Sequence, residues 1–535
     1  MDRTNLIRLK LRNGHVRFQC LRARWRLRTS GGARISGVIM PDLTIRADYQ
    51  TVTQPFRHTW EGLVNIDQFR WFVRKDTQEH LKLAHDELGA RHVRAVGMYD
   101  DEMRVFAGDP RAFRDASRKG PRVNWQVTDY AIRSLLEVGI NPMFTTCFCP
   151  GAMASGTKTC FSTRARVSPP TSYEQWADLV RESVRHVMDI FGRDVVRKWY
   201  FEVWNEPNLG GFWDADQAEF FKLWRITVGA IKSVDAELRI GGPSTARAEW
   251  VADLIEFGRR NDCEPDYLIT HIYNNDSESN PLLPFDGPQE DKVSKSPNFA
   301  SGVVRGTRTL LDSLGYKGEI HWNEWGRSWF PCEPQRETAN EGAWVVRTMG
   351  EVSQLADYFG YWCLSDIYDQ VGYGAETFHG NYGMLNLHGL RKPQYQAFRL
   401  LGMLGQHRVQ ATCSDSTRDS GAIVTRSPGA LQAIVYAYDH SGTAAASRHE
   451  VTINLPPGAD SKRAVLYRVT ESENNILTTW REMGSPDYLR GDQLSELHEA
   501  NLLRPSAGAV KIDGTGAHFT LPGPGVALLT VPLPE

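Results

Sequence analysis

The chain has 535 residues, of which 41% are hydrophobic and 10% aromatic, with 62 Lys and Arg against 64 Asp and Glu. This composition is ordinary for a globular protein and is too apolar for an intrinsically disordered one. The net charge of −2 provides no overall attraction to nucleic acid, and no apolar run approaches the roughly 20 residues of a membrane-spanning helix, so neither partner is expected.

The first 40 residues differ from the rest in charge. They hold ten Lys and Arg and a single acid, Asp2, for a net charge of +9, which leaves −11 on residues 41–535 given the total of −2. No apolar stretch of about 7–15 residues follows the basic part, as a secretion signal requires. We interpret 1–40 as a basic segment that is disordered or not native coding sequence, with a nucleic-acid-binding arm as the remaining alternative. We expect a cytoplasmic protein.

From residue 41 the sequence alternates between amphipathic helices and short apolar strands. Apolar residues recur at steps of three and four before Gly89, Gly192 and Gly315, which predicts three helices that end at these glycines. Eight apolar runs predict buried strands. These runs lie around 60–65 and at 92–98, 141–148, 198–207, 238–244, 266–273, 319–326 and 357–366. A strand followed by a helix, eight times over, is typical of a (β/α)8 TIM barrel, with a doubly wound open sheet as the alternative.

The period of the pattern changes after about residue 405. Segments such as AIVTRSPGALQAIVYAY, HEVTINL and VALLTVPLP alternate apolar and polar residues, with Gly, Pro and Asn between them. This pattern predicts an accessory C-terminal β-sandwich. The expected organisation is therefore a basic segment over 1–40, a barrel over 41–404 and a β-sandwich over 405–535. The TIRADY segment before the barrel is a candidate further strand of the sandwich.

Polar residues at the carboxyl ends of barrel strands are the candidates for catalysis, because the loops converge there. Asn205-Glu206 ends the fourth predicted strand and Asn323-Glu324 ends the seventh. One such Glu is often a helix cap or a loop ion-pair residue. Two on nearly opposite strands supply the pair of carboxylates that glycoside hydrolysis needs on either side of a sugar ring.

The segment FEVWNEPNL at 201–209, followed by Phe212-Trp213, resembles the acid/base segment of family 39 glycoside hydrolases. The resemblance continues in order through MYDDEMRVF, ASGTKT, VSPPTSYEQWADLV, IGGPS, IHWNEWGRS, YWCLSD, FHGNYGM and LRKPQYQAF, and so spans roughly 45–405. That family contains β-xylosidases and α-L-iduronidases, and the β-xylosidase branch is the more similar. The resemblance implies a retaining glycosidase of a barrel fold that acts on an oligosaccharide or glycoside without a cofactor or metal.

The resemblance also implies roles for individual residues. Glu206 matches the general acid/base and Glu324 the nucleophile, and Asn205 matches the residue that holds the sugar 2-hydroxyl. Three further residues match positions around the sugar: His271 and Tyr273 near the nucleophile, and Trp362 in the wall under the ring. On the residues alone, these last three are more often core than site.

Two departures from the family pattern bear on the sugar. The second strand usually ends in His-Gly, whereas this chain has Val96-Gly97; after Ser-Asp on the eighth strand the family's β-xylosidases carry paired Glu, whereas this chain has Asp369-Gln370. Asp369 is the expected substrate-binding residue at that position. A β-D-xyloside is the expected substrate, and an α-L-arabinoside, a hexoside or an iduronide is the alternative.

Two hypotheses from other classes remain. A serine hydrolase centred on Ser244 would use the segment 242–246, which lacks the last Gly of the nucleophile elbow Gly-x-Ser-x-Gly. A carbohydrate-binding barrel without activity is the other, and the presence of both carboxylates argues against it.

Overall fold

The computed structural model describes residues 38–39, 42–276, 296, 298–370, 372–442 and 447–533. The prediction for residues 1–40 falls outside these, apart from β1 (Val38–Ile39), a two-residue strand that pairs in parallel with β18 (Ser447–Ile453).

The eight strands expected of a barrel are present and form one parallel sheet. They are β3 (Leu63–Gln68), β4 (His92–Val96), β7 (Asn141–Thr146), β10 (Tyr200–Val203), β11 (Arg239–Ala246), β12 (Tyr267–Tyr273), β13 (Glu319–Gly326) and β14 (Tyr358–Tyr361). Hydrogen bonds close the sheet between its two ends, because the Leu364 N–H donates to the Asn65 carbonyl over 2.9 Å and Asn65 Nδ2 donates to the Gly360 carbonyl over 3.0 Å. The prediction of a TIM barrel is confirmed.

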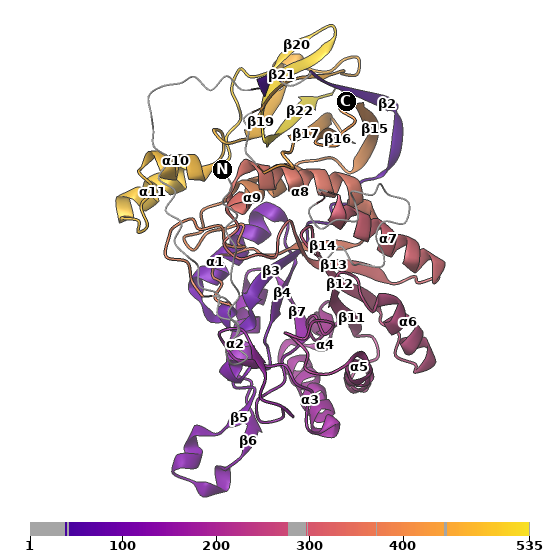
Figure 1. The fold of residues 1–535 in the computed structure, drawn as a ribbon, viewed down its shortest axis with the longest axis vertical. Coiled ribbons are helices and arrows are strands. Elements are labelled where there is room, and N and C mark those ends of the chain that lie inside the picture. The colour runs from indigo at the N-terminus through magenta and orange to yellow at the C-terminus, as the bar shows by residue number, and fades with distance from the viewer. Residues whose placement is uncertain are drawn as a thin grey trace, which may run out of the picture. The chain divides into compact units, whose positions relative to one another are not determined.

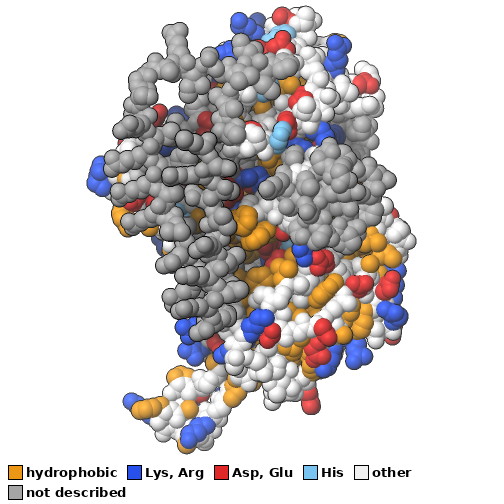
Figure 2. All heavy atoms as spheres, in the orientation of Figure 1, with side chains coloured by type: hydrophobic (Ala, Val, Ile, Leu, Met, Phe, Trp, Pro, Cys, Tyr) orange, Lys and Arg blue, Asp and Glu red, His pale blue; other side chains and the backbone are white. Residues whose placement is uncertain are grey.

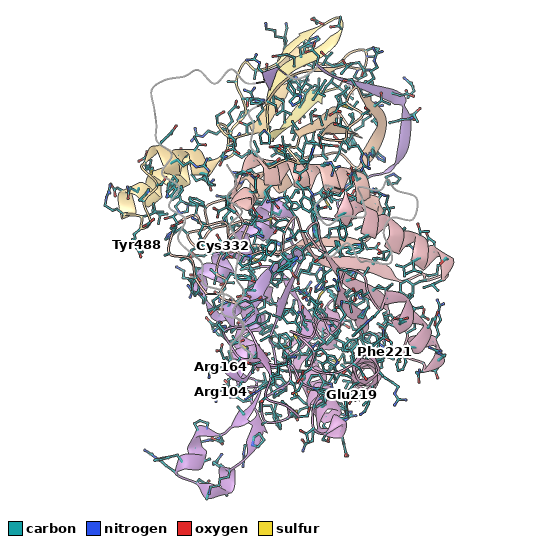
Figure 3. The ribbon with its side chains drawn as sticks, in the orientation of Figure 1. Arg104, Arg164, Glu219, Phe221, Cys332 and Tyr488 are labelled. Carbon is teal, nitrogen blue, oxygen red and sulfur yellow. The ribbon has the colours of Figure 1, made fainter. Side chains whose placement is uncertain are left out.

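Helices pack around these strands, as Figure 1 shows. They are α1 (Lys75–Leu88), α2 (Gln126–Glu137), α3 (Tyr173–Phe191), α4 (Arg193–Val196), α5 (Gln217–Lys232), α6 (Val251–Arg260), α7 (Phe299–Ser313), α8 (Ala339–Val352) and α9 (Pro393–Gly402). Helix α5 illustrates their two-sided character: Phe221 is buried, whereas the half-buried Glu219 accepts a hydrogen bond from Tyr173 of α3 (Figure 3). Burial of such apolar faces against the strands holds the barrel together.

Shorter elements lie in the connections. Two small hairpins are formed by β5 (Phe106–Gly108) with β6 (Pro121–Val123) and by β8 (Thr159–Cys160) with β9 (Ala165–Arg166). The 3-10 helices η1 (Phe69–Val73) and η2 (Asp101–Met103) follow β3 and β4. They therefore lie in loops at the carboxyl ends of the barrel strands, the end where TIM-barrel sites are built.

A second, mostly antiparallel sheet forms the accessory domain, as expected. Its strands are β2 (Leu43–Pro55), β15 (His407–Cys413), β16 (Ser420–Ser427), β17 (Ala430–Ala437), β18, β19 (Val465–Val469), β20 (Lys511–Asp513), β21 (Gly516–Gly523) and β22 (Gly525–Pro532), with β1 at the side of β18. Its apolar side chains form a core of their own, which includes Leu43, Val424, Phe519 and Leu529. Two helices, α10 (Ile476–Glu482) and α11 (Gly491–Ala500), interrupt the strands and were not expected from the sequence.

The strand β2 belongs to the accessory sheet and not to the barrel. It pairs antiparallel with β15 and in parallel with β18, so the TIRADY segment is indeed a strand of the second domain. The sequence analysis expected the barrel to begin at residue 41. Because β2 belongs to the accessory sheet, the barrel part of the chain begins after Pro55 instead. The reason is that β2 finds its hydrogen-bonding partners more than 350 residues away, as in the Ala47–Ala411 pair.

Helix α8 of the barrel contacts the accessory domain. Its Asn340 side chain donates to the Asp439 carbonyl over 2.8 Å and accepts from the Asp439 N–H, also over 2.8 Å. Charged side chains of both signs are intermixed on the described surface in Figure 2. Among the helices of the described residues, none combines the length and the apolar character needed to cross a membrane.

Candidate active site

Two barrel strands bring Glu206 and Glu324 to the same end of the barrel. Glu324 lies in β13, and Glu206 follows β10 in a turn where Trp204 and Glu206 have left-handed backbone φ angles of 67° and 44°. The Glu206 N–H donates to the Ser244 carbonyl over 2.8 Å, which fixes this turn against β11. Non-glycine residues adopt such angles at a cost, and they are found preferentially where function requires a side chain to be aimed. Both glutamates keep 8% of their surface exposed, so a substrate can reach them.

His271 lies between the two carboxylates. Its Nδ1 is 3.0 Å from Oε1 of Glu206 and 3.5 Å from Oε2 of Glu324. The register of β12 with β13 places His271 opposite Glu324. One oxygen of each glutamate and a ring nitrogen of His271 all lie within 4.8 Å of one another. The two glutamates predicted to be catalytic and His271, which the resemblance places near the nucleophile, are therefore adjacent.

Glu324 receives two hydrogen bonds that favour its ionised form. The Tyr273 hydroxyl donates to Oε1 over 2.6 Å, and Arg94 Nη1 donates to Oε2 over 2.9 Å. Asn205 joins the same network, because its Oδ1 accepts from Arg94 Nη2 over 2.6 Å. Asn205 and Tyr273, both predicted from the sequence, are thus linked directly or through Arg94 to the carboxylate of Glu324.

Burial sets the protonation of the three central groups. Loss of water raises the pKa of Glu206 to about 7, although Arg94 and Arg247 oppose this rise. Burial and the nearby charge of Glu206 also raise the pKa of Glu324, against His271, Arg94 and the Tyr273 hydrogen bond. Burial lowers the pKa of His271 to about 4, so its imidazole is neutral at pH 7. Both carboxyl groups therefore have a raised pKa, and Glu324 in addition accepts hydrogen bonds from Arg94 and Tyr273 that favour its ionised form.

Trp362 lies beside this network, and Asp369 forms an ion pair with Arg70. The Trp362 ring belongs to a buried cluster with Tyr273, and its centroid is 6.0 Å from Cζ of Arg94. Asp369, in contrast, accepts from Arg70 Nη2 with both oxygens, each over 2.6 Å. The contacts of Asp369 are therefore with a cation of the β3 loop rather than with the two glutamates.

Two residues of the site were missed by the sequence analysis, Arg94 and Glu202. Both are fully buried, and Arg94 Nε donates to Oε2 of Glu202 over 2.8 Å. The signal was present: each charge stands inside an otherwise apolar strand, HVRAV and YFEV. A charged residue at an inward position of a barrel strand requires a buried partner, so each of the two implied a buried residue of opposite charge.

The cluster of Glu206, His271 and Glu324 also has residue types that bind divalent cations. The guanidinium of Arg94 already donates to Oε2 of Glu324, however, and a metal ion there would lie next to a fixed positive charge. The donor set therefore fits carboxylate chemistry better than metal binding.

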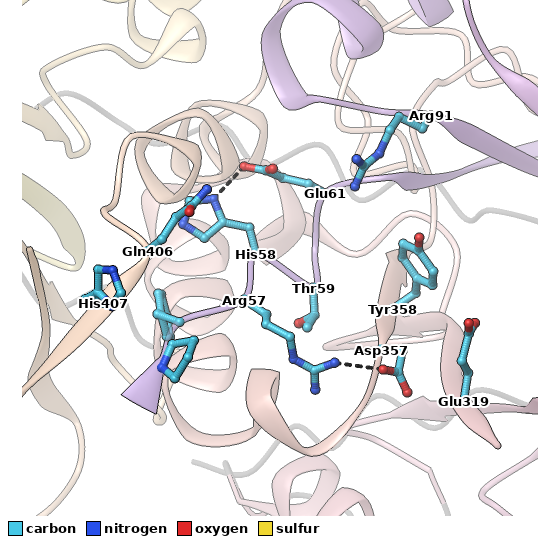
Figure 4. A pocket seen from close by; sticks show the side chains of 12 residues that line it. Arg57, His58, Thr59, Glu61, Arg91, Glu319, Asp357, Tyr358, Gln406 and His407 are labelled. Atoms are coloured by element: carbon cyan, nitrogen blue, oxygen red, sulfur yellow. Dashed lines mark hydrogen bonds and ion pairs between the residues drawn. The ribbon is translucent and has the colours of Figure 1, made fainter. Parts of the chain in front are cut away.

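A cavity of about 540 Å³ lies at the other end of the strands (Figure 4). Residues that precede β3, β4 and β14 line it, and its charged groups are largely paired: Arg57 Nη1 with Asp357 over 2.8 Å, and His58 with Glu61 over 2.7 Å. It is remote in the fold from Glu206 and Glu324, and the end of a TIM barrel where it lies is associated with stability rather than catalysis.

Comparison with known proteins shows the family of the chain. The family model "Glycosyl hydrolases family 39" matches residues 43–516. A beta-xylosidase of Caldicellulosiruptor saccharolyticus is 32% identical over 455 residues, 83% of this chain and 88% of that protein; one of Geobacillus stearothermophilus is 29% identical over 81% of this chain and 84% of that protein. The crystal structure of a monomeric beta-xylosidase from Caulobacter crescentus superposes with a TM-score of 0.78 at 27% identity, covering 92% of this chain and all of that one. The chain is therefore a glycoside hydrolase and belongs to family 39.

Proposed function

We propose that the protein is a retaining exo-glycosidase that removes β-D-xylose from non-reducing ends, with Glu324 as nucleophile and Glu206 as general acid/base. The observation that carries the proposal is the close approach of these two carboxyl groups. An oxygen of Glu206 and an oxygen of Glu324 lie within 4.8 Å of each other and of a ring nitrogen of His271. Retaining glycosidases hold their carboxyl groups about 5–5.5 Å apart, whereas inverting enzymes leave about 6.5–9.5 Å for a water molecule.

In the first step, Glu324 attacks the anomeric carbon while Glu206 gives its proton to the departing oxygen. This forms one carbon–oxygen bond and breaks another, which leaves a glycosyl ester on Glu324. We assign Asn205 to the 2-hydroxyl of the sugar, and the hydrogen bond of 2.6 Å from Arg94 to its Oδ1 supports this role because it orients the side-chain amide. Hydrogen bonds to that hydroxyl strengthen in the transition state.

In the second step, Glu206 takes a proton from water, which hydrolyses the ester and frees Glu324. A change of charge on Glu324 drives this exchange of roles. The ester no longer balances the positive charge of Arg94, so that charge stabilises ionised Glu206 more strongly and its pKa falls below about 7.

The two curated relatives at 32% and 29% identity are named beta-xylosidases, which supports xylose as the sugar. Val96 leaves room for another choice. Its side chain is fully buried at the end of β4 and forms no hydrogen bond, so a sugar hydroxyl directed at it would be unpaired. An unpaired buried hydroxyl costs about 1–3 kcal/mol. An α-L-arabinoside or a hexoside handled by the same two glutamates is therefore the second candidate.

The test has two parts. A panel of nitrophenyl glycosides should show release fastest from the β-xyloside, and proton NMR of the first-formed sugar should show retained configuration. An inverted product would overturn the role of Glu324. Fast release from an arabinoside or hexoside alone would overturn the choice of xylose and leave the mechanism intact. Binding of xylobiose with no turnover of any glycoside would favour a binding protein.

A further inference from the structure

The mechanism above gives no role to Glu202, an acidic residue of the barrel interior. Glu202 lies in β10, is fully buried, and contacts side chains from four other strands. Its Oε1 accepts from Arg94 Nε over 3.1 Å, Ser244 Oγ over 2.9 Å and Asn323 Nδ2 over 2.9 Å. Its Oε2 accepts from Arg94 Nε over 2.8 Å and Thr145 Oγ1 over 2.8 Å. A carboxylate with this many donors is held in one position.

Arg94 connects Glu202 to the reacting groups. Its Nε faces Glu202, its Nη1 donates to Glu324 over 2.9 Å, and its Nη2 donates to Asn205 over 2.6 Å. A planar guanidinium presents donors in a fixed fork, so the position of one edge determines the position of the others. We propose that Glu202 is a positioning residue of the reaction, which fixes Arg94 in place and divides its positive charge between Glu202 and Glu324.

The charges around these carboxylates are consistent with this role. Burial by itself would raise the pKa of Glu202, but Arg94 and the hydrogen bonds lower it overall, so Glu202 is ionised. The titratable groups of the neighbouring elements that face Glu202, Glu206 or Glu324 are Arg94, Cys147, Arg247, Tyr267, His271, Tyr273, Asp276, Tyr368 and Tyr382. Of these, the two arginines carry positive charge at neutral pH, and Arg94 forms an ion pair with Glu324 over 2.9 Å.

The inference rests on the proposed function and predicts a distinct effect on its pH dependence. In Glu202→Gln, Arg94 keeps its charge and loses one of its two anionic partners. The positive charge of Arg94 then stabilises the ionised forms of Glu324 and Glu206 more strongly, which lowers the pKa of both groups. Both limbs of the pH profile of kcat/KM should therefore move to lower pH by about one unit. Less precise placement of Arg94 should also lower kcat about 10- to 100-fold.

A matched control separates this effect from loss of stability. Asp235 is another buried carboxylate, paired with Arg193 over 2.7 Å and Arg197 over 2.9 Å, and it lies before β11 at the amino end of the barrel. Asp235→Asn should lower the melting temperature and leave both limbs where they are. The fraction of active enzyme is measured by labelling Glu324 with a 2-fluoro glycoside. The proposal would be overturned if both limbs of the kcat/KM profile of Glu202→Gln stay where they are and its kcat falls only by the fraction of enzyme that is not labelled.

Glu202→Asp keeps the test available if the Gln variant does not fold. It retains the charge and withdraws the carboxylate by about 1.5 Å, one carbon–carbon bond. The limbs should then stay within a few tenths of a pH unit while kcat falls at least about 10-fold; an unchanged kcat would overturn the proposal. Failure of the 2-fluoro glycoside to label Glu324 in the unmodified protein would instead count against the proposed function.

Discussion

Tyr273 donates its hydroxyl to Oε1 of Glu324 over 2.6 Å, while Arg94 donates to the other oxygen of the same carboxylate. The two donors come from β12 and β4, which are separated in the barrel sheet by β11, β10 and β7. Both favour the ionised form of Glu324. The carboxylate is therefore oriented at both oxygens before any sugar binds.

Removal of the tyrosine hydroxyl should shift the acidic limb of activity. A hydrogen bond to a charged group contributes about 1.5–3 kcal/mol, and about 1.4 kcal/mol corresponds to one pKa unit. In Tyr273→Phe the ionised form of Glu324 loses this support, so its pKa rises and the acidic limb of kcat/KM moves up by about one to two units. Tyr382→Phe is the control, because the Tyr382 hydroxyl donates to the Trp329 carbonyl instead. If the acidic limb of kcat/KM lies at the same pH in Tyr273→Phe and Tyr382→Phe, the hydrogen bond from Tyr273 does not affect the ionisation of Glu324.

The two glutamates should differ in what their removal costs. Glu324→Gly should abolish turnover of every glycoside, because no glycosyl ester can form. Glu206→Ala should lose much less on dinitrophenyl glycosides, whose leaving group needs no proton, and azide should partly restore it by attacking the ester without base assistance. Rate measurements on dinitrophenyl and unactivated glycosides decide the point. Equal losses for both variants on all substrates would contradict these roles.

The raised pKa of Glu206 predicts a pH-dependent change in stability. Its pKa is about 7 in the folded protein against an ordinary value of 4.5, so the folded state binds the proton more tightly. This contribution is fully present below about pH 4.5 and is lost as the pH rises through about 7. Glu206→Gln cannot ionise, so its stability relative to the unmodified protein should increase from pH 5 to pH 8, by up to roughly 3 kcal/mol. Denaturant unfolding of both proteins across this range measures the difference; a constant difference would contradict the raised pKa.

Asp369 should act through Arg70 and not by binding the sugar. Arg70 pairs with Asp369 over 2.6 Å and with Glu102 of η2 over 2.7 Å, so it ties three loops of the active-site end together. Asp369→Ala and Glu102→Ala should therefore each raise KM a few-fold, by similar factors for xylosides and arabinosides. A loss confined to Asp369→Ala, and to one sugar, would show a direct contact. Val96→His should instead change the ratio between the sugars.

The sequence predicted the parts of the molecule that local patterns determine. All eight barrel strands overlap the expected runs, and the carboxylates at the ends of β10 and β13 lie together, because parallel strands of a barrel end at one face. The missing parts depend on long-range pairing. Nothing in the residues around Arg94 identifies Glu202 as its partner, and nothing in TIRADY identifies β15. The ion pair of Asp369 with Arg70 could not be predicted from the sequence either, because it depends on how η1 lies against the loop after β14.

The position of β2 has a consequence for how the chain reaches its native state. The accessory sheet takes a strand from each side of the barrel sequence, so in topology the barrel is an insertion within the accessory domain. During synthesis β2 emerges first and has no partner until β15 follows, some 350 residues later. A strand left with unpaired N–H and C=O groups for that time is prone to pair with other chains. Truncation after residue 404 would make that situation permanent, so the barrel cannot be isolated cleanly by cutting the chain only at its C-terminal side.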